Sequence, residues 1–97
     1  MKSVRIENYD RKSRKFQIDL KHFLISLAQG AMVGLGEAPD PETKRKTTNL
    51  EMVKYHLGVL QMLKRKTNGN LSDEEQNLIN VLLEDVHGKL SVVMENT

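Results

Sequence analysis

Few side chains in this sequence have the type and spacing that chemistry on a substrate or a metal requires. Glu84 and His87 stand three residues apart, the spacing of one half of a carboxylate-bridged di-metal site, which needs a second such pair and two further glutamates. His22 and Ser26 share a helical face and could pair as base and nucleophile, but no third orienting residue or oxyanion element can be named for them. We therefore predict no catalytic residue, no metal site, no cofactor and no enzymatic activity.

Charge offers a second basis for binding. The net charge of +2 is unevenly spread, because residues 1–21 carry +4, residues 22–70 carry +3 and residues 71–97 carry −5. The basic clusters at residues 11–15, 44–46 and 64–66 suit phosphate contacts, which makes a nucleic-acid-associated protein the alternative function. We expect weak, unspecific binding at most, because neither interleaved aromatic residues nor a recognisable binding fold accompanies the clusters.

The middle of the chain contains the clearest predicted helix. Its apolar residues recur at steps of three and four, the pattern of one helical face: Leu50, Val53, Leu57, Leu60 and Leu63. Its start is marked twice, by Asn49 as a possible N-cap and by Thr48 with Glu51 three residues later as a capping box. Residues 64–66 place positive charge at the negative end of the helix dipole, and Asn68 and Gly69 tolerate the left-handed conformation of a helix stop.

Two further helices flank the central one. The first is expected over residues 19–35, ending at Gly36, and its apolar residues cover more than one face, so it needs cover from two directions. The other begins at Ser72, where Glu75 three residues later completes a capping box. We expect this third helix to continue through Gly88 to about residue 94.

Two sets of residues are candidate interfaces with a second copy of the chain. The central helix carries a second apolar row, formed by Met52, Tyr55, Val59 and Met62. The first helix offers apolar side chains and a row of small residues along which another helix backbone can approach closely: Phe23, Leu27, Gly30 and Gly34. We predict a homo-oligomer, with a dimer favoured, that can also bind another protein.

A stiff, charged loop over residues 37–47 follows the first helix, because Pro39 and Pro41 fix their own φ angles and hold the residues before them extended. Together with Gly36, Asp40 and the turn after the central helix, this loop closely resembles a small bacterial family catalogued as domain of unknown function 1844. Two motifs carry the resemblance: Leu35-Gly36-Glu37-Ala38-Pro39-Asp40-Pro41-Glu42-Thr43, and Lys66-Thr67-Asn68-Gly69-Asn70-Leu71 followed by Glu74-Glu75.

The resemblance covers about residues 23–86. It implies a small helical bacterial protein and brings no established catalytic residue with it. The chain departs from the family pattern in its basic N-terminal arm, at Gly58 and over residues 84–87.

Length and composition complete the expectation. A chain of 97 residues without cysteine suits one domain in the cytoplasm, and its most apolar segment, residues 23–35, is shorter than the ~20 residues that cross a bilayer. We predict a basic arm over residues 1–19, either flexible or a short hairpin, and an all-α three-helix domain over residues 20–97. Its favoured function is a non-catalytic helical module for homo-oligomerisation or protein interaction.

Overall fold

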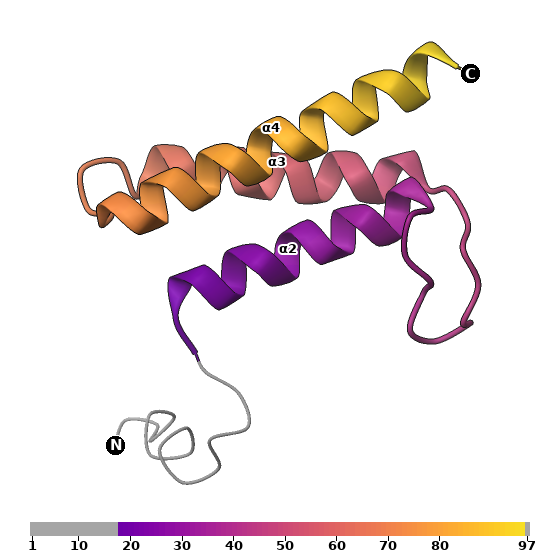
Figure 1. Cartoon of the computed structure of the whole chain (residues 1–97), viewed down its shortest axis with the longest axis horizontal. Coiled ribbons are helices and arrows are strands. Elements are labelled where there is room, and N and C mark those ends of the chain that lie inside the picture. The colour runs from indigo at the N-terminus through magenta and orange to yellow at the C-terminus, as the bar shows by residue number, and fades with distance from the viewer. Residues whose placement is uncertain (1–17, 97) are drawn as a thin grey trace, which may run out of the picture.

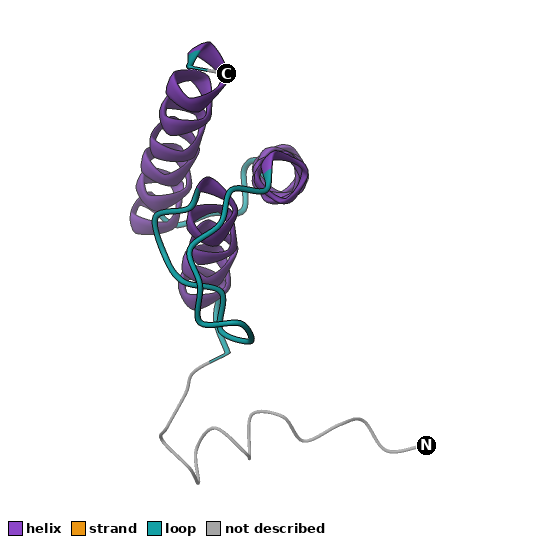
Figure 2. Ribbon diagram, turned by 90° about the vertical axis from the view of Figure 1, so that its right-hand side faces the viewer, coloured by secondary structure: helices purple, strands orange, loops and turns teal. Residues whose placement is uncertain are grey.

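The computed structural model describes residues 18–96. These residues form three helices, α2 (Leu20–Leu35), α3 (Leu50–Lys66) and α4 (Asp73–Glu95) (Figure 1). Each helix contacts both of the others, and Figure 2 shows them at the corners of a triangle rather than in one layer. The predicted all-α, three-helix fold is therefore confirmed, while residues 1–17 of the predicted arm lie outside the described residues.

Local capping sets both ends of α2 and the start of α4. The sequence predicts the stop at Gly36 and the capping box at Ser72, whereas the N-cap at Asp19 is seen only in the structure. The Asp19 carboxylate accepts a hydrogen bond from the His22 amide at 2.9 Å, and Gly36 ends α2 in the left-handed conformation, with φ of 84°. At α4, Ser72 Oγ accepts from the Glu75 amide at 3.1 Å, and the Glu75 carboxylate accepts from the Ser72 amide at 2.9 Å. The N-caps Asp19 and Ser72 supply partners for amides that the first helical turn leaves free, and the Gly36 amide donates to the Met32 and Val33 carbonyls of the last turn of α2.

The structure defines both ends of α3 more closely than the sequence does. Of the two possible starts, Asn49 is the N-cap, and its side chain accepts from the Met52 amide at 3.2 Å. The helix ends at Lys66, before the predicted stop. The Thr67 amide makes the last i→i−4 bond, to the Leu63 carbonyl at 2.9 Å, and the Asn68 and Asn70 amides then bond to carbonyls only three residues back, at 3.4 and 2.8 Å. Gly69 does adopt a left-handed conformation, with φ of 87°, but it lies in the turn after the helix. α4 continues through Gly88 to Glu95, as predicted.

The core is apolar throughout and draws on all three helices. Its fully or nearly fully buried members are Leu24, Ala28, Ala31, Leu35, Val53, Leu57, Leu60, Ile79, Val86 and Leu90. No polar or charged residue among the described residues is buried as a whole, but the side-chain oxygen of half-buried Asn80 is buried and has no hydrogen-bond partner among residues 18–96. Each buried Leu, Ile or Val contributes about 1.5–3 kcal/mol relative to an exposed one, so these three faces hold the helices together.

Helix α2 lies against both other helices, which explains most of its wide apolar arc within one chain. On one flank Gly34 is buried against α3, where an added Cβ would lie 2.8 Å from Val53 Cγ2 and 2.9 Å from the Asn49 carbonyl oxygen. On the other flank, Lys21 Nζ lies 3.4 Å from the Glu74 carboxylate of α4. The two directions of cover that the arc requires are therefore largely provided by α3 and α4 of the same chain.

The loop between α2 and α3 is built around Asp40. Its carboxylate accepts from the Glu42 and Thr43 amides at 2.7 and 3.2 Å, and its backbone bonds to Lys44 and Arg45 across the turn. At the start of the loop, Glu37 bonds Lys89 of α4 at 3.1 Å, which raises the pKa of Lys89. This proline-containing loop is thus tied to its own turn and to α4.

Candidate interaction surface

One stripe of α3 points directly away from the core. Its members follow one another at steps of four and three residues, and all five are exposed: Glu51, Tyr55, Gly58, Met62 and Arg65. At 100° per residue this stripe lies opposite Val53, Leu57 and Leu60, which are buried. We call these five residues the outer stripe of α3.

Large apolar side chains project from this stripe. Tyr55 is 67% exposed and Met62 is 37% exposed, whereas Met52 and Val59, on the flank that turns towards α2, are half-buried. The predicted row of four therefore splits into two outward and two flanking positions. Exposed aromatic and methionine side chains are typical of protein interfaces.

The neighbouring His56 supports Tyr55. Its Nδ1 lies 2.8 Å from the Met52 carbonyl oxygen, and its ring occupies the space above Gly30, where an added Cβ would lie 2.9 Å or less from three ring atoms. The Tyr55 ring stands edge-to-face on it, with centroids 5.3 Å apart. His56 thus lies against Gly30 of α2 and against the exposed Tyr55 ring.

The other predicted interface residues lie on the α3-facing flank of α2. Contacts of Gly34 with Val53 and of Gly30 with His56 show that α2 and α3 run antiparallel. Phe23 and Leu27 continue the same flank at helical steps, and Phe23 is 48% exposed. Gly30 and Gly34 are covered by α3 instead, so their small size serves packing within the chain.

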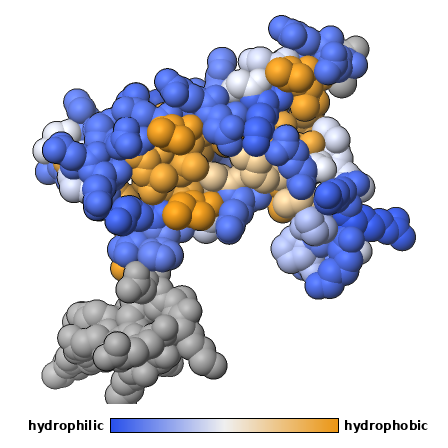
Figure 3. All heavy atoms as spheres, viewed as in Figure 1, coloured by the Kyte–Doolittle hydropathy of each residue, from blue (hydrophilic) through white to orange (hydrophobic). Residues whose placement is uncertain are grey.

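A second apolar area, which the sequence reasoning did not single out, lies between α2 and α4. Figure 3 shows apolar atoms gathered over these two helices, where Ile25 is 41% and Val81 is 52% exposed. They line a shallow hollow of about 500 Å³ with charged and polar residues around them: Lys21, His22, Glu74 and Asn77. The exposure of Ile25 and Val81 can be predicted only when the faces covered by the other helices are known.

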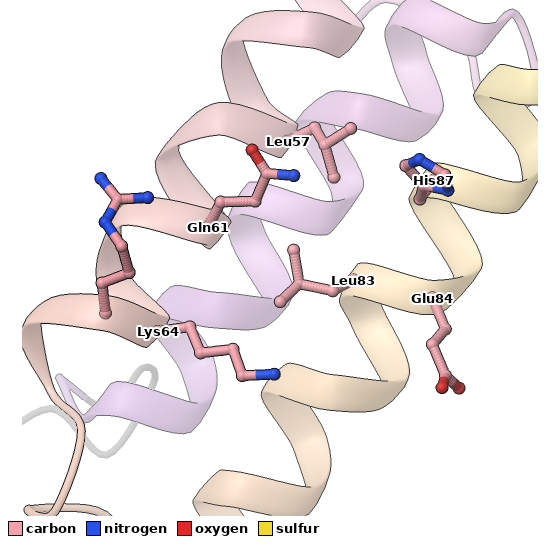
Figure 4. Close-up of a pocket in the computed structure, with 7 residues that line it drawn as sticks. Leu57, Gln61, Lys64, Leu83, Glu84 and His87 are labelled. Carbon is pink, nitrogen blue, oxygen red and sulfur yellow. The ribbon is translucent and has the colours of Figure 1, made fainter.

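A shallow groove of about 520 Å³ runs between α3 and α4 (Figure 4). Its apolar floor is formed by Leu57 and Leu83, and its rim is lined by Gln61, Lys64, Arg65, Glu84 and His87. The rim side chains come from both helices and are exposed. Such an open groove lacks the enclosure with which small-molecule sites bury most of a ligand.

The candidate catalytic side chains His22 and Ser26 are engaged in local hydrogen bonds. His22 Nδ1 lies 2.7 Å from the Asp19 carboxylate, and the bonds from His22 lower the pKa of Asp19. Ser26 Oγ donates to the Phe23 carbonyl at 2.7 Å, a common helix back-bond that does not present it as a nucleophile. Within residues 18–96, no three His, Cys, Asp or Glu side chains converge as metal ligands.

The basic clusters are spatially separate. Residues 44–46 lie in the loop before α3 and residues 64–66 at its end, so the 17-residue helix, about 26 Å long at 1.5 Å per residue, stands between them. They do not form one continuous phosphate-binding face. Residues 11–15 lie outside the described part of the chain.

Comparison with known proteins gives one match. The family described as Domain of unknown function (DUF1844) matches residues 17–91. No curated protein and no solved structure matches the chain. Over residues 18–96, none of the helices combines the length and apolar character that crossing a membrane requires.

Proposed function

The chain belongs to the Domain of unknown function (DUF1844) family, and we propose that it is a non-catalytic helical module that binds a second copy of itself. The observation that supports the proposal is the exposed apolar surface on α3 and its α2 flank. We define the α2–α3 apolar surface by its members: Phe23, Leu27, Met52, Tyr55, Val59 and Met62.

The free energy of exposing this apolar surface to water is the reason to infer a partner for it. Leaving large apolar side chains in water forgoes about 25 cal/mol for each Å² that burial would remove from water. Contiguous exposed apolar surface rimmed by charged residues is typical of protein interfaces. Two-fold homodimers are the commonest closed assemblies, so a second copy is the first partner to test.

The arrangement of the candidate catalytic residues favours a binding role over a catalytic one. The Ser26 hydroxyl is bonded to a carbonyl, His22 and Asp19 are paired on an exposed helix start, and the α3–α4 groove is open to solvent. A catalytic site instead brings nucleophile, base and oxyanion donors together around one reacting atom.

The experiment compares sedimentation velocity of the wild-type chain with Tyr55→Glu and Val81→Glu at micromolar concentration. Both positions are more than half exposed, so neither change should unfold the helix that carries it. We expect Tyr55→Glu to shift the chain towards monomer and Val81→Glu, on α4, to leave the dimer intact. Equal effects of the two variants would refute the assignment of the α2–α3 apolar surface.

A further inference from the structure

The outer stripe of α3 is complementary to its own antiparallel copy. Glu51 and Arg65 stand seven residues before and after Gly58, and Tyr55 and Met62 stand between them and Gly58. A stripe with an acid at one end, a base at the other and apolar residues inside matches a second copy that runs in the opposite direction.

Gly58 at the centre of this stripe has no packing role among residues 18–96. Nothing lies within 4 Å of an added Cβ there, whereas Gly34 meets Val53 and Asn49. Glycine destabilises a helix interior relative to alanine. A second backbone approaching at Gly58 supplies the missing reason for a residue without a side chain, as at close helix crossings.

We propose that two copies of the chain associate through antiparallel α3 helices that cross at Gly58, on a two-fold axis. This geometry rests on the proposed self-association and names the surface that performs it. Tyr55 and Met62 of each copy then pack beside Gly58 of the other copy, and each Glu51 faces Arg65 of the second copy. Half-buried Met52 and Val59 border the contact.

Charge selects the antiparallel direction. The net charge of α3 is positive, because Lys54 and residues 64–66 outnumber Glu51. A parallel pair would bring both 64–66 clusters together. In the antiparallel pair each cluster lies about 10 Å from the axis at 1.5 Å per residue, so the two are about 20 Å apart, beyond the ~8 Å screening length at physiological salt.

Helix α4 offers the matched comparison. Gly88 is also exposed in mid-helix, and nothing lies within 4 Å of an added Cβ. Its outward neighbours include Glu84 and Asp85, and α4 has Lys89 as its single basic residue, so two copies of α4 repel each other. Gly88 therefore shares the local environment of Gly58 but not the self-complementary stripe.

Single cysteines test the crossing, since the natural chain contains none. A cysteine on a two-fold axis meets its own copy, and a disulfide forms when the two Cα atoms lie about 4.4–6.8 Å apart. Under mild oxidation at micromolar concentration, we expect Gly58→Cys to give a linked dimer at least ten times faster than Gly88→Cys. Equal rates would overturn the crossing at Gly58.

Charge reversal tests the direction independently. Glu51→Arg and Arg65→Glu alone should each raise the dimer dissociation constant at least fivefold, and the double variant should return it towards the wild-type value. A double variant weaker than both single variants would overturn the antiparallel pairing. A monomeric wild type would refute the proposed function itself, whereas a wild-type dimer without fast Gly58→Cys linkage would refute this geometry alone.

Discussion

At the scale of single residues, the glycines show how one residue type serves different ends. Gly36 and Gly69 adopt positive φ angles of 84° and 87°, where a side chain is strained. Gly34 is needed for space, because a Cβ would meet Val53 and the Asn49 carbonyl. Gly58 and Gly88 have neither a positive φ angle nor a neighbour within 4 Å of an added Cβ among residues 18–96. Contacts among these residues therefore do not explain the glycine at position 58, and we assign it to the proposed helix crossing.

The contrast between Gly69 and Gly88 predicts opposite effects of one substitution. Both have open space around an added Cβ, so Gly69→Ala should cost about 1 kcal/mol through strain at positive φ. Gly88→Ala should stabilise by roughly 0.5–1 kcal/mol, because alanine favours the helix interior. Urea unfolding measures both, and an unchanged midpoint for Gly69→Ala would show that its left-handed conformation carries no strain penalty.

At the scale of elements, helix starts could be predicted and helix partners could not. The starts at Asp19, Asn49 and Ser72 depend on side chains within three residues of the amides they bond, which a sequence displays directly. The row of small residues ending at Gly34 revealed that a helix would approach, but not that α3 of the same chain would be that helix. Such pairing depends on how the loops direct the chain.

The cap of α2 predicts a pH dependence. Bonds from the His22 amide and ring lower the pKa of the Asp19 carboxyl, so the unfolded chain binds its proton more tightly. The stabilisation by the ionised carboxylate is therefore complete above about pH 4 and is lost as pH falls through the folded pKa.

The variant Asp19→Asn isolates this effect, because an amide oxygen still caps the helix. We expect the melting temperature of the wild type to exceed that of Asp19→Asn at pH 6. The difference should shrink as the pH is lowered from 4 to 2. A difference independent of pH across that range would argue that the carboxylate charge contributes nothing to the folded state.

At the scale of the whole molecule, three helices of this length cannot cover all of their apolar surface. Residues 24, 53 and 79 are fully buried, while Tyr55, Val81 and Val92 remain more than half exposed. Helix α4 also extends beyond α2 and α3 at its C-terminal end (Figure 1). Periodicity predicted the buried positions well, but the exposed faces depend on how the three helices are placed in space.

Both the proposed function and the crossing at Gly58 require the intact chain to self-associate. Sedimentation equilibrium of the wild type, over concentrations from well below to well above ten micromolar, measures this association. A crossing of one helix pair is smaller than a standard protein interface, so we expect reversible association in the micromolar range. The fitted mass should rise from 11.1 kDa to about twice that value. A mass that stays at that of one chain throughout would contradict the account.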